Sequence, residues 1–209
     1  MSCPQTMASI EPVLGTCAFR PGQTYKIFFQ KIYSAEGVKN GVLLADAEDV
    51  AEFSPFLAAA DETRIVATDK IGGGKVTPGA VKEFGGGNET PGGSPIAIGK
   101  GTSKFEGKMF MTLQSAIKEL KKLEDVSGLG VYFVSHNDKI TGKVEAIEAA
   151  DTLVPIPIEQ YPYFQDLEMG ELETPVSNML GFYLPENWSD DIQTVECPGI
   201  KDLVNTSTP

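Results

Sequence analysis

The chain of 209 residues has one histidine, one tryptophan and three cysteines, and it has no excess of positive charge. His136 is therefore the only imidazole that a Ser/His/Asp or Cys/His catalytic group could use as its base. It lies in the sequence His-Asn-Asp between two apolar runs, which is typical of a turn. No Gly-x-Ser-x-Gly sequence accompanies it. We expect a solvent-exposed turn histidine and no catalytic residues.

The spacing of the cysteines and the length of the apolar runs exclude further classes of protein. Cys3, Cys17 and Cys197 share no Cys-x-x-Cys spacing, so we expect three free thiols outside the core and neither a zinc site nor a disulfide framework. No apolar run approaches the roughly 18 residues that a membrane-spanning helix needs. The first residues also lack the basic and apolar regions of a signal peptide. These absences predict synthesis in a cytosol and no membrane partner.

The formal net charge is −12, from 29 acidic and 17 basic residues. This balance opposes nucleic-acid recognition, because binding a phosphate backbone needs clustered Lys and Arg. An acidic wall can still face a nucleic acid usefully, since it repels phosphate and lets a polyanion slide past. Closely spaced acids follow from this composition and match no EF-hand pattern, so we expect no metal site. They are Asp46/Glu48/Asp49, Glu168/Glu171/Glu173 and Asp190/Asp191, and we expect residues 166–173 to form a solvated or lumen-facing surface.

Half of the chain's 22 glycines lie between Ile71 and Gly101. Three segments there, 71–75, 85–94 and 99–104, have the composition of phosphate-binding loops. A P-loop needs Ser or Thr directly after Gly-Lys, and neither Gly-Lys pair has one. The sequence after Gly101 also predicts a strand, whereas a phosphate loop opens a helix. We therefore expect no cofactor, and a long loop that a partner orders.

Hydrophobic periodicity predicts a mainly β chain with one clear helix. The expected strands are 24–33, 63–71, 103–113, 129–135, 139–149 and 152–158, with the hairpin turn at residues 136–138. In the strand 103–113, one face carries Phe105, Gly107, Met109 and Met111. The helix begins with Thr112 as its N-cap, ends at Ser127-Gly128, and has an apolar stripe of Leu113, Ala116, Ile117, Leu120 and Leu123. Shorter elements are expected at residues 13–19 (strand), 54–61 (helix) and 96–98 (strand).

These elements predict an α+β fold that is mainly β: an antiparallel β-sandwich or small barrel with one flanking amphipathic helix, a long Gly-rich loop and extended termini. We divide the chain into an N-terminal arm (1–24), an α+β core (25–160) that includes the Gly-rich loop 72–101, and an acidic C-terminal extension (161–209). In that extension, Phe182, Tyr183 and Trp188 have no basic neighbours. We expect them in the core or at a subunit contact rather than in a base-stacking platform.

The order of segments from Ser54 to Ile147 resembles a known family. It runs SPFLAAADETRIVATDKI, then GGGNETPGG, then FEGKMFMTLQSAIKELKKLEDVSGLGVYFVSHNDKITGKV. This layout is similar to that of structural proteins of tailed bacteriophages, most of all tail tube subunits. The resemblance implies a β-sandwich or small barrel beside a helix, with six copies closing a ring and rings stacking into a tube.

The resemblance also implies roles for particular segments. Leu113, Ile117, Leu120 and Leu123 would belong to the flanking helix, and the loop 72–101 would be the assembly device, with Gly72, Phe84, Asn88, Pro91 and Ile96 as its candidate contact residues. The partners would be further copies of the chain, other virion proteins and passing DNA that is not bound specifically. The protein would be located in the virion, after synthesis in the bacterial host cytoplasm.

We therefore predict a virion structural subunit that self-assembles into a ring or tube around an acidic conduit for DNA. Another virion ring, a connector or a capsid decoration protein would share the same composition. A different class stays open as well, a small cytosolic enzyme or ligand-binding module in which the Gly-rich segment is a lid.

Overall fold

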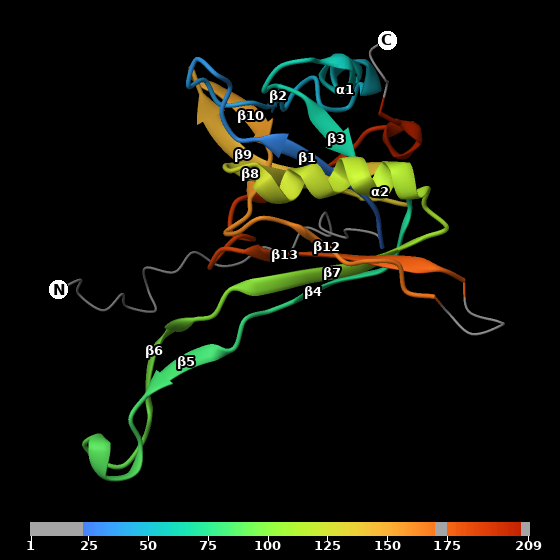
Figure 1. The fold of residues 1–209 in the computed structure, drawn as a ribbon. Helices are drawn as coiled ribbons and strands as arrows, with labels where there is room; N and C mark the ends of the chain where they lie inside the picture. The colour runs from blue at the N-terminus through green and yellow to red at the C-terminus, as the bar shows by residue number, and fades with distance from the viewer. Residues whose placement is uncertain (1–22, 170–174, 206–209) are drawn as a thin grey trace.

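The computed structural model of the chain describes residues 23–169 and 175–205 (Figure 1). Its helices are α1 (Ser54–Ala58) and α2 (Gln114–Lys121), with short 3-10 helices η2 (Val50–Glu52), η3 (Gly87–Glu89), η4 (Lys122–Asp125) and η5 (Ile200–Asp202). Its strands are β1 (Thr24–Lys31), β2 (Val42–Leu43), β3 (Ile65–Ala67), β4 (Ile71–Thr77), β5 (Val81–Phe84), β6 (Ile96–Lys100), β7 (Ser103–Phe110), β8 (Leu129–Ser135), β9 (Lys139–Ile147), β10 (Ala150–Val154), β11 (Ile156–Pro157), β12 (Tyr163–Phe164), β13 (Ser177–Leu184) and β14 (Ile192–Glu196).

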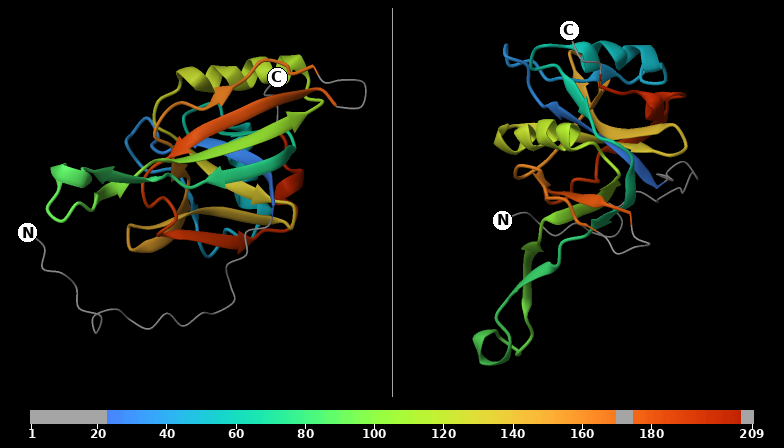
Figure 2. Two further views of the ribbon diagram at one scale, coloured as in Figure 1. Left: turned by 90° about the horizontal axis from the view of Figure 1, so that it is seen from below. Right: turned by 45° about the vertical axis from the view of Figure 1, so that its right-hand side comes forward.

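The strands form two packed antiparallel sheets and a separate hairpin (Figures 1 and 2). The larger sheet has eight strands: the order is β2-β10-β9-β8-β1-β3, with β11 paired to β8 and β14 paired to β9. The smaller sheet has the order β12-β13-β7-β4, and β5 pairs with β6 alone. The predicted fold class, a mainly β antiparallel sandwich with a flanking helix, is confirmed. The strands expected at 24–33, 103–113, 129–135 and 139–149 are also present, each shortened by a few residues at most.

The first hydrophobic core fills the space between the two sheets, and α2 covers one open side of it. Aromatic rings form its centre: Phe105 and Phe182 stack with their centroids 4.8 Å apart and their planes 18° from parallel. Phe29 meets Phe182 edge to face, with 5.9 Å between the centroids. These contacts join β1 of the larger sheet to β7 and β13 of the smaller one, so the cohesion of the sandwich depends on them.

A second core lies on the opposite face of the larger sheet, beneath η2, α1 and η5. Strands β1 and β8 are therefore buried on both faces: Ile27 and Phe29 enter the first core, whereas Phe28 between them enters the second. Burial on both faces explains why these strands are apolar at almost every position. A strand that is buried on one face only would alternate apolar and polar residues. The hydroxyl of Tyr132, in the second core, donates to Gln30 Oε1 at 3.2 Å, and burial raises its pKa well above the usual value for tyrosine.

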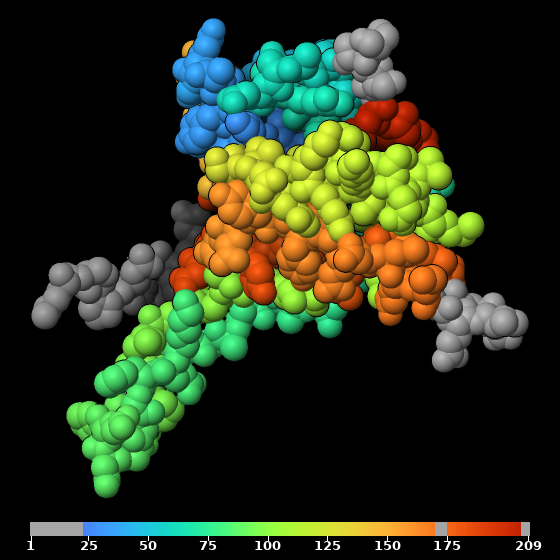
Figure 3. Space-filling view, viewed as in Figure 1, coloured from blue at the N-terminus to red at the C-terminus, as the bar shows by residue number. Residues whose placement is uncertain are grey.

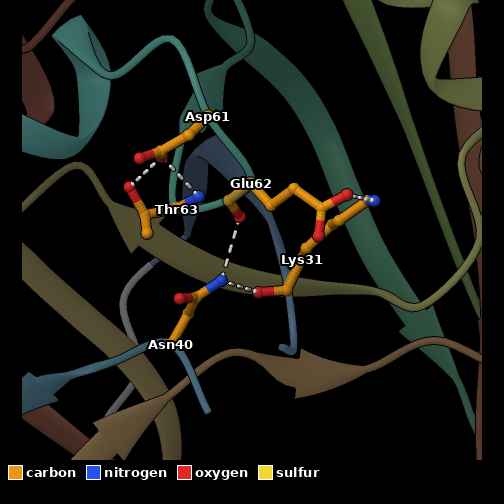
Figure 4. Close-up of polar contacts among 5 residues, drawn as sticks. All are labelled: Lys31, Asn40, Asp61, Glu62 and Thr63. Carbon is orange, nitrogen blue, oxygen red and sulfur yellow. Dashed lines mark hydrogen bonds and ion pairs between the residues drawn. The ribbon is translucent and has the colours of Figure 1, made fainter. Parts of the chain in front are cut away.

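Asn40 joins two loops at the edge of the larger sheet (Figure 4). Its buried amide nitrogen donates to the carbonyl oxygens of Lys31 and Glu62, both at 2.9 Å. The side chains of Lys31 and Glu62 form an ion pair at 2.5 Å. Asp61 Oδ1 accepts from both the backbone N–H and the hydroxyl of Thr63, which holds the pKa of that carboxyl below its usual range. Both amide hydrogens of Asn40 are used, so this cluster is structural.

Helix α2 differs from the prediction at its N-terminus. Its N-cap residue is Leu113, which is 75% exposed, and Thr112 does not cap it. The Thr112 hydroxyl is buried and has no hydrogen-bond partner among the described residues. Met111, which was expected to face the core, is exposed and has a positive φ of 55° that turns the chain away from β7. The deeper part of the predicted stripe, Ile117, Leu120 and Leu123, is buried as expected.

Within the predicted C-terminal extension, the described residues 161–169 and 175–205 belong to the body, contrary to the prediction, because β12, β13 and β14 lie within the two sheets. Leu180, Phe182 and Leu184 of β13 are fully buried in the first core. Gly181, on the outer face of β13, lies beneath the Tyr163 ring, where a Cβ atom would come within 2.1 Å of its hydroxyl oxygen. Because this face is covered, β13 lacks the exposed polar residues that would have identified it as a strand.

The first 22 residues of the predicted N-terminal arm lie outside the described residues, and so do the strand expected at 13–19, Cys3 and Cys17. Thr24, the last residue of that arm, is the first residue of β1.

Cys197 is also placed differently from the prediction, since it is fully buried in the second core. Burial, with smaller effects from the carboxylates of Asp49 and Asp138, raises the pKa of its thiol to about 11. A thiolate is therefore disfavoured at neutral pH, and the residue behaves as a small apolar side chain.

Asp138 ties the β8–β9 turn to the segment before η5. Its carboxylate accepts from the backbone N–H of Gly199 at 3.2 Å and from the Lys201 ammonium at 2.7 Å. The hydrogen bond from Lys201 lowers the pKa of Asp138 below its ordinary value of 3.8. The ionised carboxyl therefore stabilises the fold above pH 3.8, and this contribution is lost as the pH falls below that value.

We expect Asp138→Asn to lower the free energy of unfolding by about 1 kcal/mol at pH 7, because the charged partner of Lys201 is lost. Urea denaturation at pH 7 and at pH 3 measures the effect. The difference from the natural chain should shrink at pH 3, where its own carboxyl begins to protonate. Asp190→Asn, at an exposed carboxyl, is the control and should change little at either pH. If Asp138→Asn lowers the free energy of unfolding by the same amount at both pH values, the electrostatic explanation is contradicted.

Candidate functional site

Residues 78–102 leave the smaller sheet as a two-stranded hairpin, here called the hairpin arm (Figures 1 and 3). It continues from the end of β4 and returns into the start of β7, which are neighbouring strands of that sheet. The hairpin arm contributes no side chain to either hydrophobic core. In the space-filling view it stands clear of the body over most of its length (Figure 3). It is the most distinctive surface feature of the described chain.

The Gly-rich segment was predicted as a long loop, and it is instead mostly strand. Gly72 to Thr77 belong to β4 in the smaller sheet, so Gly72 lies in the body and not in the hairpin arm. A Cβ atom at Gly72 would come 2.5 Å from the Phe110 ring, which shows that this ring lies across β4. The other candidate assembly residues, Phe84, Asn88, Pro91 and Ile96, are all exposed on the hairpin arm, and their role in assembly stays a prediction.

The junction between the body and the hairpin arm is narrow. Pro78 ends the pairing of β4, since proline has no N–H to donate to a neighbouring strand. Beyond it, a Cβ atom at Gly79 would come 2.1 Å from the carbonyl oxygen of Gly101, so the two strands approach too closely there for a side chain. Two polar contacts near this junction reach the turn after β13: Lys82 lies 3.6 Å from Glu186, and Lys100 donates to Asn187 at 3.3 Å.

The tip of the hairpin arm, residues 85–95, is a folded loop that uses its own polar groups. The N–H of Gly87 donates to Gly93 O at 3.1 Å, and the N–H of Gly93 donates to Thr90 O at 3.0 Å. The buried Thr90 hydroxyl donates to Ser94 O at 2.6 Å. Five tip glycines have positive φ, which explains their number in this segment: Gly85, Gly86, Gly87, Gly92 and Gly93. The amides of Gly87 and Gly93 thus point at carbonyls of the loop, and none of the three segments considered as phosphate loops opens an α-helix.

A β-bulge decides which exposed apolar side chains of the hairpin arm share a face. The cross-strand pairs are Val81 with Lys100 and Phe84 with Ile96, and the register shifts between Lys82 and Glu83. The extra residue is Ile98 of β6, so β5 keeps its alternation, and Val81 and Phe84 point to opposite faces. Phe84 and Ile96 are opposite each other and point to the same face. We call this pair, with the bulge residue Ile98, the apolar face of the hairpin arm. Each of the three side chains is between 52% and 65% exposed.

The sequence did not identify the bulge in β6. Its extra residue, Ile98, interrupts the alternation that a regular strand would show. The apolar triplet at 96–98 was recognised as a short strand, but its pairing with β5 was not. A segment this rich in glycine gives no alternation from which the register could be read.

Other candidate chemical groups occupy ordinary positions. His136 is exposed in the hairpin turn, as predicted, and its ring packs edge on against Tyr25 with 5.2 Å between the centroids. Asp49 caps η2 by accepting from the N–H of Ala51 at 2.9 Å. Glu168 pairs with Lys108 at 2.8 Å, whereas Glu171 and Glu173 lie outside the described residues. Within residues 23–169 and 175–205, no group of three or more His, Cys, Asp and Glu side chains is placed to hold a metal ion.

A cleft of about 730 Å³ lies between α2, β3 and the segment at Val204. Residues of the hairpin arm do not line it. In the part of the chain that the structure describes, no helix has both the length and the apolar character needed to cross a bilayer.

No protein family model, curated protein or solved structure matches this chain. The hairpin arm therefore has to be interpreted from its own geometry and chemistry.

Proposed function

We propose that the chain is a virion structural subunit that assembles with further copies of itself into a ring or tube, in the manner of a tail tube subunit. The observation that carries the proposal is the apolar face of the hairpin arm, which no other part of the described chain covers. Contiguous exposed apolar side chains on a soluble protein mark surfaces that bind other proteins. A two-stranded hairpin is also only marginally stable alone in water, so a hairpin of this length gains stability when a partner covers it.

The charge of the chain supports the conduit part of the proposal. The net charge of −12 leaves an excess of carboxylates over the surface, and exposed acids lie on α2 and β14, namely Glu119 and Glu196. Carboxylates that line a channel repel phosphate, so DNA passes without being held. The ring is proposed to be six-fold, as the resemblance implies, and its location is the virion, where other virion proteins are further partners. A connector or decoration protein would use the same type of arm.

The alternative from another class, an enzyme or ligand-binding module with a Gly-rich lid, requires the Gly-rich segment to close over a cleft. The hairpin arm extends away from the body (Figure 1), and none of its residues lines the cleft beside α2. This geometry favours assembly over a lid. The lid hypothesis predicts a protein of one subunit whose thermal stability rises when a nucleotide or sugar is added.

Light scattering combined with size-exclusion chromatography tests the proposal, together with negative-stain images. We expect a mass that is a multiple of 22.4 kDa and that increases with concentration, and images of rings or tubes in which the copies can be counted. A protein that stays at 22.4 kDa over the whole accessible concentration range would contradict the proposal. Nucleotide or sugar stabilisation of that single subunit would support the lid hypothesis instead.

A further inference from the structure

A second cluster of exposed apolar side chains lies at the end of the smaller sheet that is farthest from the hairpin arm. Met111 and Met169 are the most exposed members, at 81% and 83%. We call this cluster the end patch, and its residues are Phe110, Met111, Leu113, Leu167, Met169 and Val176. Of the fifteen large apolar side chains that are exposed in the described chain, ten belong to the end patch or to the hairpin arm.

Backbone pairing shows that the three segments of the end patch lie side by side. The N–H of Met111 donates to Val176 O at 3.1 Å, and Ser177 is paired with Phe110 on one side and with Glu168 on the other. The segments 110–113, 167–169 and 176–177 are therefore neighbours across three chain segments. The Phe110 ring is held at the surface because it lies across Gly72, where no side chain competes for the space.

The backbone at Met111 supports a role for this patch. Its φ of 55° lies in the left-handed region, which a long side chain rarely adopts and which costs about 1 kcal/mol or more. Folding alone gains little from the Met111 side chain, because that side chain is almost fully exposed. A flexible thioether side chain does, however, adapt well to a partner surface. Strain that turns an apolar side chain outward indicates a contact outside the subunit.

The two apolar surfaces cannot cover each other within one subunit. Strand β7 leaves the hairpin arm at Ser103 and ends at the end patch with Phe110. Eight residues of strand span about 27 Å, and the hairpin arm points away from the far end of that strand (Figure 1). Surfaces at opposite ends of one subunit can meet in two copies arranged head to tail. Repeating such a contact produces a ring where the rotation closes and a helical filament where it does not.

Charge favours the same pairing. The chain as a whole is strongly acidic, but the hairpin arm has two lysines and two glutamates and is formally neutral, so it approaches another acidic copy without net repulsion. The end patch is bordered by Asp166 and Glu168, which pair with Lys121 at 2.5 Å and with Lys108 at 2.8 Å. A formally neutral arm that meets a rim of paired charges encounters no like-charge repulsion.

We propose that the apolar face of the hairpin arm docks on the end patch of the next copy of this chain. The proposal depends on the proposed function, because it names the surface that the assembling arm binds. Phe84, Ile96 and Ile98 pack against Met111, Leu113 and Met169 of the next copy. Each copy thus donates one arm and accepts one.

Two double variants test this docking. The arm variant is Phe84→Asp with Ile98→Asp, and the patch variant is Met111→Asp with Leu113→Asp. The patch variant should fold well, because aspartate tolerates positive φ and is a preferred N-cap residue, which is the position of Leu113. The control is Val38→Asp with Leu43→Asp, which adds the same charge at exposed positions of the β1–β2 region.

Light scattering should show that the arm variant and the patch variant are each monomeric at concentrations where the natural chain and the control are fully assembled. An equimolar mixture of the two variants should form a dimer of one copy of each, because one intact contact remains between the natural patch and the natural arm. Mixing that yields no dimer overturns the head-to-tail contact. A patch variant that assembles like the natural chain overturns the docking site but leaves the proposed function standing, whereas a natural chain that never assembles overturns both.

Discussion

Phe182→Ala is expected to lower the free energy of unfolding by about 3–5 kcal/mol, one of the two largest effects that the structure predicts. The ring is fully buried and stacks on Phe105 at 4.8 Å between centroids. It also meets Phe29 across the sandwich, so alanine removes contacts to both sheets at once. The cavity lies at the centre of the first core, where the surrounding strands are paired on both sides and can collapse only in part.

Urea denaturation monitored by circular dichroism measures this loss. Tyr183→Ala is the matched control, because Tyr183 is the next residue of β13 and lies on its outer, half-buried face. We expect a loss of about 1 kcal/mol for the control. Equal losses for the two variants would show that residues 177–184 do not form part of the core, contrary to the placement of β13 between β12 and β7.

Shortening the hairpin arm should abolish assembly and leave the stability of the fold almost unchanged. Phe182→Ala, in contrast, lowers stability. The change replaces residues 82–99 with Asn-Gly, so that Val81 and Lys100, which are already paired, are joined by a two-residue turn. No residue of the hairpin arm lies in either core, so the free energy of unfolding should change by less than about 1 kcal/mol.

Chromatography with light scattering and a urea titration, run on the same preparation, measure both quantities. The control is Glu89→Gln, which alters the exposed tip but keeps the apolar face and every candidate contact residue, and it should assemble. Normal rings or tubes from the shortened chain would show that the hairpin arm is not the assembly device. A shortened chain that is unfolded would instead contradict the separation of the hairpin arm from the body.

The elements predicted well from the sequence are those whose burial follows a simple period. In β7, Phe105, Gly107 and Met109 alternate with exposed residues, and in α2 the buried residues follow the helical repeat. The β8–β9 hairpin was also predicted correctly from its turn. The prediction was wrong where tertiary contacts hide the period, as at β13, whose outer face is covered by Tyr163, and at Cys197, which is buried by segments far away in the chain.

Glycine content indicated an unusual segment, but the sequence predicted a loop where the structure has a hairpin. Phe84 and Ile96 are exposed, and their role as contact residues stays a prediction. The hairpin form depends on pairing between residues about fifteen positions apart, for which a Gly-rich sequence carries no signal. The end patch could not be predicted either, because it gathers three separate segments whose proximity exists only in the folded sheet.

The narrow junction at Gly79 and Gly101 has a consequence for the shape of any assembly. Near it, the hairpin arm is attached to the β13–β14 turn by one ion pair and one hydrogen bond, both at the surface, where such contacts contribute little energy. The inclination between successive copies is therefore determined by the surface that receives the hairpin arm. The curvature of a ring is then determined by the contact between two subunits. Substitutions at the receiving surface should therefore alter the diameter of the ring without altering the fold of each subunit.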